Sequence, residues 1–211
     1  MKKKFVHGIF VNKYSGKKLV YYPCPKNANS SAKLFFADHL GIKNNFIFVS
    51  DKIPAFKQTV NDYKGKENLV NFLPSKQKFS QIIADEKCCI IRDPMERFIS
   101  TYRNRILYHK DLIFRNFSID MVIEKISIGL FENKHFLPQN YFLGPSLDYY
   151  TFYANTNNLK KFEKKVNEFF DKNISFPKIQ IGGQNFKIEL SNSQIKKIKK
   201  IYEKDYDIFG L

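Results

Sequence analysis

The chain of 211 residues is long enough to bury a core without disulfides or metals, and we expect a single domain over 1–211. Hydrophobic residues make up 43% of it and aromatic residues 16%, which excludes a disordered chain. The formal net charge of +16 suits a polyanionic partner, but the joint excess of Lys, Asn, Ile, Phe and Tyr also fits an AT-rich genome, so both explanations of the charge stay open.

The sequence has no run that suggests a membrane span and no disulfide framework. No apolar stretch approaches the roughly 20 residues that cross a bilayer, and the N-terminal MKKKFVHGIFV lacks the small-residue cleavage site of a signal peptide. The three cysteines include the neighbours Cys88 and Cys89, which a strand would point to opposite faces. We therefore expect a soluble, cytoplasmic protein with buried thiols.

In the first half of the chain, apolar runs alternate with amphipathic segments. We expect strands at 5–11, 17–23, 45–50 and 87–92, and helices at 32–40 and 79–86. His39 falls on the apolar face of the first helix, so we interpret it as a core residue rather than a catalytic one. The polar, Lys-rich stretch 51–78 has few periodic apolar positions, and we expect it to shape a substrate pocket.

In the second half, helical periodicity dominates. We expect helices at 94–107, 118–128, 159–172 and 193–202, with a strand at 149–154. Strands that alternate with helices favour an α/β layer architecture around a largely parallel sheet. No internal repeat or linker divides the chain, and nothing in it indicates an oligomeric state.

The stretch PCPKNANSS joins the second expected strand to the first expected helix. Such a junction suits an anion, because the first helical N–H groups have no backbone partner and the helix dipole is positive there. Lys26 adds a positive charge, and Ser30 and Ser31 lie where a helix N-cap is wanted. The stretch has neither the glycines nor the lysine position of the ATP-binding P-loop. A plain capped helix is the alternative.

A second strand, turn and helix junction occurs at RDPMERFISTYRNR. Arg92 ends the strand, and Ser100 lies one turn beyond Arg97 on the next helix, so Arg92 and Ser100 can converge on one anion. In the alternative interpretation, Asp93 caps the helix and Arg97 makes a surface pair with Glu96 or Asp93.

Together the two junctions resemble the cofactor motifs of the sulfotransferases that depend on PAPS (3′-phosphoadenosine 5′-phosphosulfate). PKNANSS resembles their 5′-phosphosulfate loop, and RDPMERFISTYRNR resembles the 3′-phosphate motif of the carbohydrate branch (heparan, chondroitin and HNK-1 type). KHFLPQ is similar to the His-x-x-Pro-Gln element of that branch, and IYEKDYDIFG to its closing Tyr-x-x-Asp-Tyr-x-x-Phe-Gly signature. The segments 41–78 and 174–190 match no part of the family.

This resemblance implies a P-loop-like three-layer fold and transfer of a sulfuryl group from PAPS to a hydroxyl of a carbohydrate, with PAP as the product. Basic residues in 51–78 and around 109–145 would suit a carbohydrate that is itself anionic. The residues implied to hold the 5′-phosphosulfate are Lys26, Asn27, Ala28, Asn29, Ser30 and Ser31. Arg92 and Ser100 are implied to bind the 3′-phosphate. The family needs no metal, and no residues here have metal-ligand spacing.

The general base is the open element of this mechanism. We favour His135 in KHFLPQ, with Asp62, Glu67 and His109 as alternatives. Two other functions compete with the sulfotransferase. A P-loop-like kinase or NTPase lacks support because the glycines are missing, and a non-catalytic polyanion-binding module would rest on charge alone. Because no nucleic-acid-binding motif accompanies the lysines, we expect no nucleic-acid partner.

Overall fold

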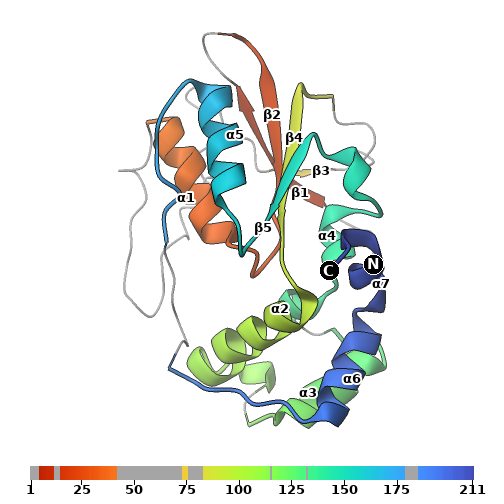
Figure 1. The fold of residues 1–211 in the computed structure, drawn as a ribbon. Coiled ribbons are helices and arrows are strands. Elements are labelled where there is room, and N and C mark those ends of the chain that lie inside the picture. Colours follow the sequence, from red (N-terminus) through yellow and green to blue (C-terminus); the bar gives the residue numbers. More distant parts are fainter. Residues whose placement is uncertain are drawn as a thin grey trace.

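The computed structural model describes residues 5–11, 15–41, 73–75, 83–114, 116–131, 133–178 and 185–211, with the backbone alone for the first and third of these segments. Within them, a five-stranded sheet has the strand order β3-β1-β2-β4-β5 (Figure 1). The strands are β1 (Phe5–Val11), β2 (Lys18–Tyr22), β3 (Leu73–Ser75), β4 (Glu86–Ile91) and β5 (Phe152–Asn155).

The sheet combines a parallel part with an antiparallel edge. Strands β2, β4 and β5 pair in parallel, while β1 pairs antiparallel with both β2 and β3. A short connection between β1 and β2 can join only antiparallel neighbours, whereas helices separate β2 from β4 and β4 from β5 along the chain. The expected α/β architecture is confirmed, and β2 and β4 end at the same edge of the sheet.

Helices cover both faces of the parallel strands, which gives three layers. On one face lie α1 (Asn29–His39) and α5 (Lys160–Phe170), and on the other lie α4 (Gln139–Leu143) and α7 (Glu203–Phe209) (Figure 1). Alternate strand residues point to opposite faces. Cys88 accordingly packs in the core beneath α1 and α5, and Cys89 in the core beneath α4 and α7, as expected.

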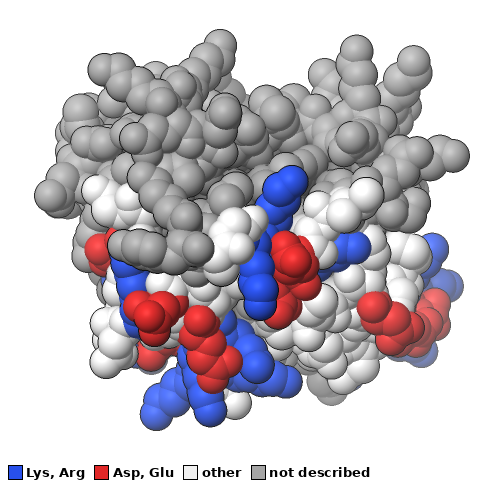
Figure 2. Space-filling view, turned by 90° about the horizontal axis from the view of Figure 1, so that it is seen from above, with Lys and Arg blue, Asp and Glu red and all other residues white. Residues whose placement is uncertain are grey.

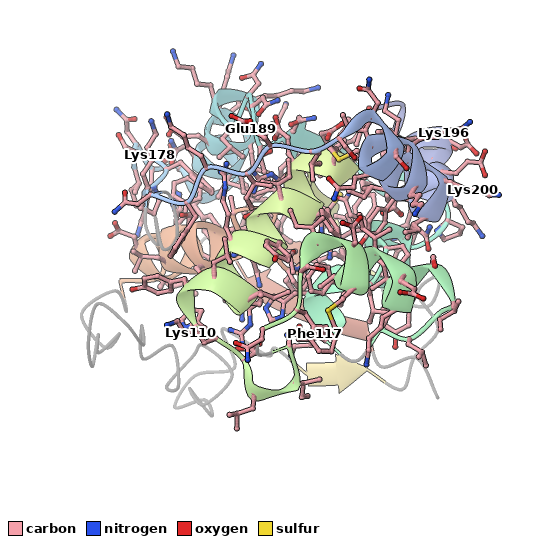
Figure 3. The ribbon with its side chains drawn as sticks, turned by 90° about the horizontal axis from the view of Figure 1, so that it is seen from below. Lys110, Phe117, Lys178, Glu189, Lys196 and Lys200 are labelled. Atoms are coloured by element: carbon pink, nitrogen blue, oxygen red, sulfur yellow. The ribbon has the colours of Figure 1, made fainter. Side chains whose placement is uncertain are left out.

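A third core forms among helices that follow β4. It joins α2 (Pro94–Thr101), its continuation as the π-helix η4 (Tyr102–Tyr108), α3 (Ile119–Ser127) and α6 (Asn192–Ile201). Seen from below, Lys196 and Lys200 project from α6 at the periphery of this helical layer, and Lys110 follows the end of η4 (Figure 3). The expected helices at 94–107, 118–128 and 193–202 are therefore present with small shifts of their ends.

The helix expected at 79–86 is wrong in its described part. Residues 83–85 are not helical, and Glu86 begins β4. The reason is pairing with β2, because Asp85 N–H donates to Lys18 O at 3.0 Å and Asp85 Oδ2 accepts from Lys18 N–H at 2.8 Å. The strand expected at 45–50 lies outside the described residues, as does the stretch 51–78 apart from β3.

The described part of one face of the molecule carries charges of both signs. On the face seen in Figure 2, Lys and Arg side chains are interspersed with Asp and Glu. The net charge of +16 therefore does not mark this face as a binding surface. Among the described residues, no helix is long and apolar enough to cross a membrane.

Candidate functional site

The loop between β2 and α1 has an unusual backbone for a segment without glycine. Lys26 and Ala28 have φ angles of 70° and 52°, and the φ of Asn27 between them is not positive. Each left-handed residue costs roughly 1–2 kcal/mol, and such strain concentrates at functional sites. Alternation of this kind turns successive N–H groups toward one side, as in the nests that bind anions.

The start of α1 differs from the expectation for the two serines. Ala28 is the N-cap, no side chain caps the helix, and Ser30 and Ser31 lie within its first turn. The expected N-cap role of the serines is therefore wrong, because the helix begins one residue before Ser30. The helix dipole and its first N–H groups thus point into the Lys26 loop without a capping side chain.

Asn27 anchors this loop to the sheet. Its side chain is fully buried, and its Nδ2 donates to Ile90 O at 2.8 Å and to Gln139 Oε1 at 2.6 Å. Its backbone N–H donates to Cys24 O at 3.3 Å. The side-chain Nδ2 and the backbone N–H of Asn27 thus bind other groups of the protein, and these hydrogen bonds fix the shape of the loop.

The two junctions singled out from the sequence meet directly. Arg92 Nη1 donates to Lys26 O at 3.1 Å, while Arg92 Nε lies 3.4 Å from Glu96 Oε2. Asp93 caps α2 by accepting from Glu96 N–H at 2.9 Å, as one interpretation of the sequence expected. Ser100 is half-buried on α2, and its hydroxyl has no hydrogen bond to the other described residues. The arginine and the loop backbone therefore belong to one site.

Arg97 is buried, so the surface ion pair considered for it is wrong. Its side chain is 1% exposed. Its guanidinium donates to Pro25 O at 3.0 Å, to Leu137 O at 2.7 Å and to His135 O at 3.0 Å. Three carbonyl groups thus satisfy the buried guanidinium, which ties the Lys26 loop to the KHFLPQ segment.

Gln139 and Asp205 complete this network from the C-terminal half. The fully buried Gln139 side chain accepts from Arg92 N–H at 3.0 Å and donates to Arg92 O at 2.7 Å. Asp205 of α7 caps α4, since its carboxylate accepts from the backbone N–H groups of Gln139 at 2.6 Å and Asn140 at 2.9 Å. All four motifs of the sequence therefore converge at the ends of β2 and β4.

His135 lies in the short helix η6 (Lys134–Phe136) beside this network. Its ring nitrogen Nδ1 is 2.7 Å from Asn133 Oδ1. Burial, together with the nearby charges of Arg105, Lys26, Lys134 and Arg97, lowers the pKa of His135 to about 3.

Of the other candidate bases, His109 is described and two lie beyond the described residues. His109 follows η4, and burial together with Arg105 lowers its pKa. Asp62 and Glu67 lie outside the described residues.

Positive charge gathers where these elements meet. Burial lowers the pKa of Lys26 to about 8, and the charges of Arg92, Arg105 and Arg97 act in the same direction. The Lys26 ammonium has no ion pair with any other described residue. We call the five charged side chains around this point the cation cluster: Lys26, Arg92, Arg97, Arg105 and Lys134. Cations that repel one another in a partly buried place favour the binding of an anion.

Comparison with known proteins agrees with this geometry. A family model described as the sulfotransferase family matches residues 8–211. No curated protein and no solved structure gives a significant match. The matched range includes the Lys26 loop, the Arg92 junction and the closing helix that holds α4. The chain therefore belongs to the sulfotransferase family.

Proposed function

We propose that the protein transfers a sulfuryl group from PAPS to a hydroxyl of a carbohydrate acceptor. The observation that carries the proposal is the contact between Arg92 and the backbone of the Lys26 loop. It brings together, at the end of the parallel strands, the two motifs that resemble the binding sites for the two ends of PAPS. Ligands of α/β sheets commonly bind at this edge.

The described residues fit such a donor. It carries a phosphosulfate at one end and a phosphate at the other, and it supplies an activated sulfuryl group when bound. The Lys26 loop offers an uncapped helix start and a lysine without an ion pair among the described residues, which suit the 5′-phosphosulfate. Ala28, Asn29, Ser30 and Ser31 would contact it through N–H groups and hydroxyls, while Asn27 holds the loop in shape. Arg92 and Ser100 would hold the 3′-phosphate.

In the proposed mechanism, two side chains act on the reacting atoms. The acceptor hydroxyl gives its proton to His135 as its oxygen bonds to sulfur, and Lys26 stabilises the negative charge that remains on the leaving phosphate oxygen. The pKa of about 8 leaves Lys26 mainly protonated at neutral pH, as this task requires. The protein otherwise contributes by positioning the two substrates in line.

An acceptor that already carries carboxylate or sulfate groups suits the charges on the acceptor side. Burial, together with the charge of the nearby Lys134, lowers the pKa of Lys33 of α1 to about 8. An anionic acceptor would relieve this repulsion. The resemblance to the carbohydrate branch supports the same class of acceptor.

Binding of PAP, measured by calorimetry, tests the proposal. We expect saturable binding that weakens at least about tenfold in Lys26→Ala and in Arg92→Ala, because each loses a charge-assisted contact of about 1.5–3 kcal/mol. Lys196→Ala, which removes a peripheral lysine of α6, is the matched control and should bind as the wild type does. Unchanged affinity in both site variants contradicts the proposal, and magnesium-dependent ATP turnover would point to a kinase or NTPase instead.

Transfer of labelled sulfate from PAPS to a panel of glycans then identifies the acceptor.

A further inference from the structure

We propose that Asn133, Asp111 and Arg105 form a positioning chain that holds the ring of His135 with its proton on Nδ1 and leaves Nε2 as the proton-accepting nitrogen. The inference rests on the proposed function, in which His135 is the base. The sequence alone did not indicate any of these three residues as part of the site.

The hydrogen bonds around Asn133 determine where the proton lies. The backbone N–H of His135 donates to Asn133 Oδ1 at 3.0 Å, and because a backbone N–H can only donate, this atom is the amide oxygen. The same oxygen lies 2.7 Å from His135 Nδ1. An oxygen that only accepts requires the proton on Nδ1, so the lone pair of the neutral ring is on Nε2.

The other end of the Asn133 amide is held as well. Asn133 Nδ2 donates to Asp111 Oδ2 at 2.9 Å, and Arg105 Nε donates to the same oxygen at 2.8 Å. Arginine only donates and a carboxylate only accepts, so the direction of every hydrogen bond from Arg105 to His135 is fixed. Asparagine suits position 133 because it offers one acceptor and one donor. An aspartate there would face the carboxylate of Asp111.

The π-helix η4 brings Arg105 and Asp111 together. At its end, His109 N–H donates to Asn104 O and Asp111 N–H donates to Arg105 O, both at 3.0 Å. These wide turns fold the chain back so that Asp111 reaches the side chain of Arg105. π-Helical turns occur frequently at functional sites. The chain of hydrogen bonds thus links the helix that follows Arg92 to the loop that carries His135.

Burial keeps the ring of His135 neutral, and the charges that surround it act mainly in the same direction. They come from every element around it: Lys26 of the loop, Arg97 of α2, Arg105 of η4, Lys134 of η6 and the carboxylate of Asp111. The four cations outnumber the single carboxylate, so protonation of the free protein is unfavourable. The lone pair on Nε2 is therefore available at neutral pH.

The first test measures the tautomer of His135 by ¹⁵N NMR of the full chain, with the signal assigned by its loss in His135→Gln. We expect a protonated Nδ1 and an unprotonated Nε2 in the wild type, and a mixture of tautomers in Asn133→Leu. In that variant kcat should fall about 10- to 100-fold, part of what a general base contributes, while KM and PAP affinity stay unchanged. Asn173→Leu, at an exposed asparagine, is the matched control and should change neither the tautomer nor kcat.

The second test exchanges two members of the chain. Asn133→Asp alone should lower kcat because two carboxylates then face each other, and Asp111→Asn alone should lower it because Arg105 and the Asn133 amide lose a charged acceptor. Together the two substitutions restore the donor and acceptor pattern: the carboxylate at 133 accepts from His135, and the amide at 111 donates to that carboxylate and accepts from Arg105. We expect the double variant to recover the Nδ1–H tautomer and most of kcat.

The outcomes separate this inference from the proposed function. If the wild type binds no PAP and transfers no sulfuryl group, the proposed function is wrong, and the NMR measurement still decides the positioning chain. If PAP binding is intact but the tautomer in Asn133→Leu equals that of the wild type, the positioning chain is wrong. The positioning chain is also wrong if kcat in the two single variants and the double variant falls only in proportion to the loss in melting temperature.

Discussion

Two histidines in this protein, the buried His39 and the half-buried His135, have lowered pKa values in different surroundings. His39 is 2% exposed, and its ring stacks on Phe170 and meets Phe35 edge-on. Burial lowers its pKa to about 4. The pKa of His135 is lowered to about 3 by burial and then by neighbouring cations, and its ring is held by Asn133.

The comparison shows that a lowered pKa does not by itself identify a catalytic histidine. Both rings stay neutral at physiological pH, but His39 packs against aromatic rings, whereas His135 contacts Asn133 and lies among cations that an anionic ligand can neutralise. His39 confirms the interpretation of its sequence pattern as a core position. The following predictions test whether the two histidines differ in the way that their surroundings indicate.

The largest expected effect is on catalysis. His135→Ala should lower kcat about 10²- to 10⁴-fold, the usual contribution of a general base, with PAP affinity and folding unchanged. His109→Ala, the matched control at the end of η4, should retain the wild-type kcat. If His109→Ala is inactive and His135→Ala is active, the base has been assigned to the wrong histidine.

The next effect concerns the network that holds the backbone of His135. Arg97→Met should lower the free energy of unfolding by about 3–5 kcal/mol, because the carbonyl groups of Pro25, Leu137 and His135 lose a buried charged donor. Denaturant titration measures this loss. Arg103→Met, on the same helical segment, should cost much less, and equal losses in both variants would show that the three carbonyl contacts are not important.

The apolar surroundings of His39 predict a dependence of stability on pH. The pKa of His39 is 6.5 when it is exposed and about 4 in the folded protein, so the unfolded chain binds more protons between these values. Its contribution to stability is complete above pH 6.5 and falls by about 3 kcal/mol as the pH drops to 4.

The variant His39→Leu isolates this contribution. The difference in unfolding free energy between wild type and His39→Leu, measured at several pH values, should change across this window and be constant above it. A difference that is the same at pH 4.5 and pH 7.5 would mean that the ring is not buried in its neutral form.

The smallest expected effect separates the two rings by their response to an anion. Bound PAP should raise the pKa of His135 by about 1–2 units, since a nearby opposite charge favours the charged form of a group. The pKa of His39, whose ring packs against Phe35 and Phe170, should not move. NMR titration of both rings with and without PAP gives the two shifts, and equal shifts would contradict the location of the anion site.

The sequence predicted the local part of the site better than its long-range part. The positions of Lys26 and Arg92 at strand ends follow from patterns within short segments, and the structure joins them by a hydrogen bond. The roles of Arg97, Gln139 and Asp205 depend on contacts between segments far apart in the chain, which spacing along the sequence cannot reveal. Gln139 and Asp205 lay within motifs that resemble those of the family, and this was the available signal for them.

The errors have similar physical causes. The segment 79–86 has residues that favour a helix, but its end is drawn into the sheet by pairing between Asp85 and Lys18. Ser30 was expected to cap a helix because serine often does so, yet the left-handed backbone at Ala28 starts the helix earlier. In both places, tertiary or backbone constraints outweigh intrinsic preference.

The capping of α4 by Asp205 has a consequence for the order in which the protein matures. Gln139, which fastens both Asn27 and Arg92, is itself held by a carboxylate 66 positions further along the chain. During translation, the Lys26 loop and Arg92 are synthesised before Asp205. The carboxylate that holds Gln139 in place is therefore missing until α7 leaves the ribosome. The network around Gln139 can therefore close only after α7 has been synthesised.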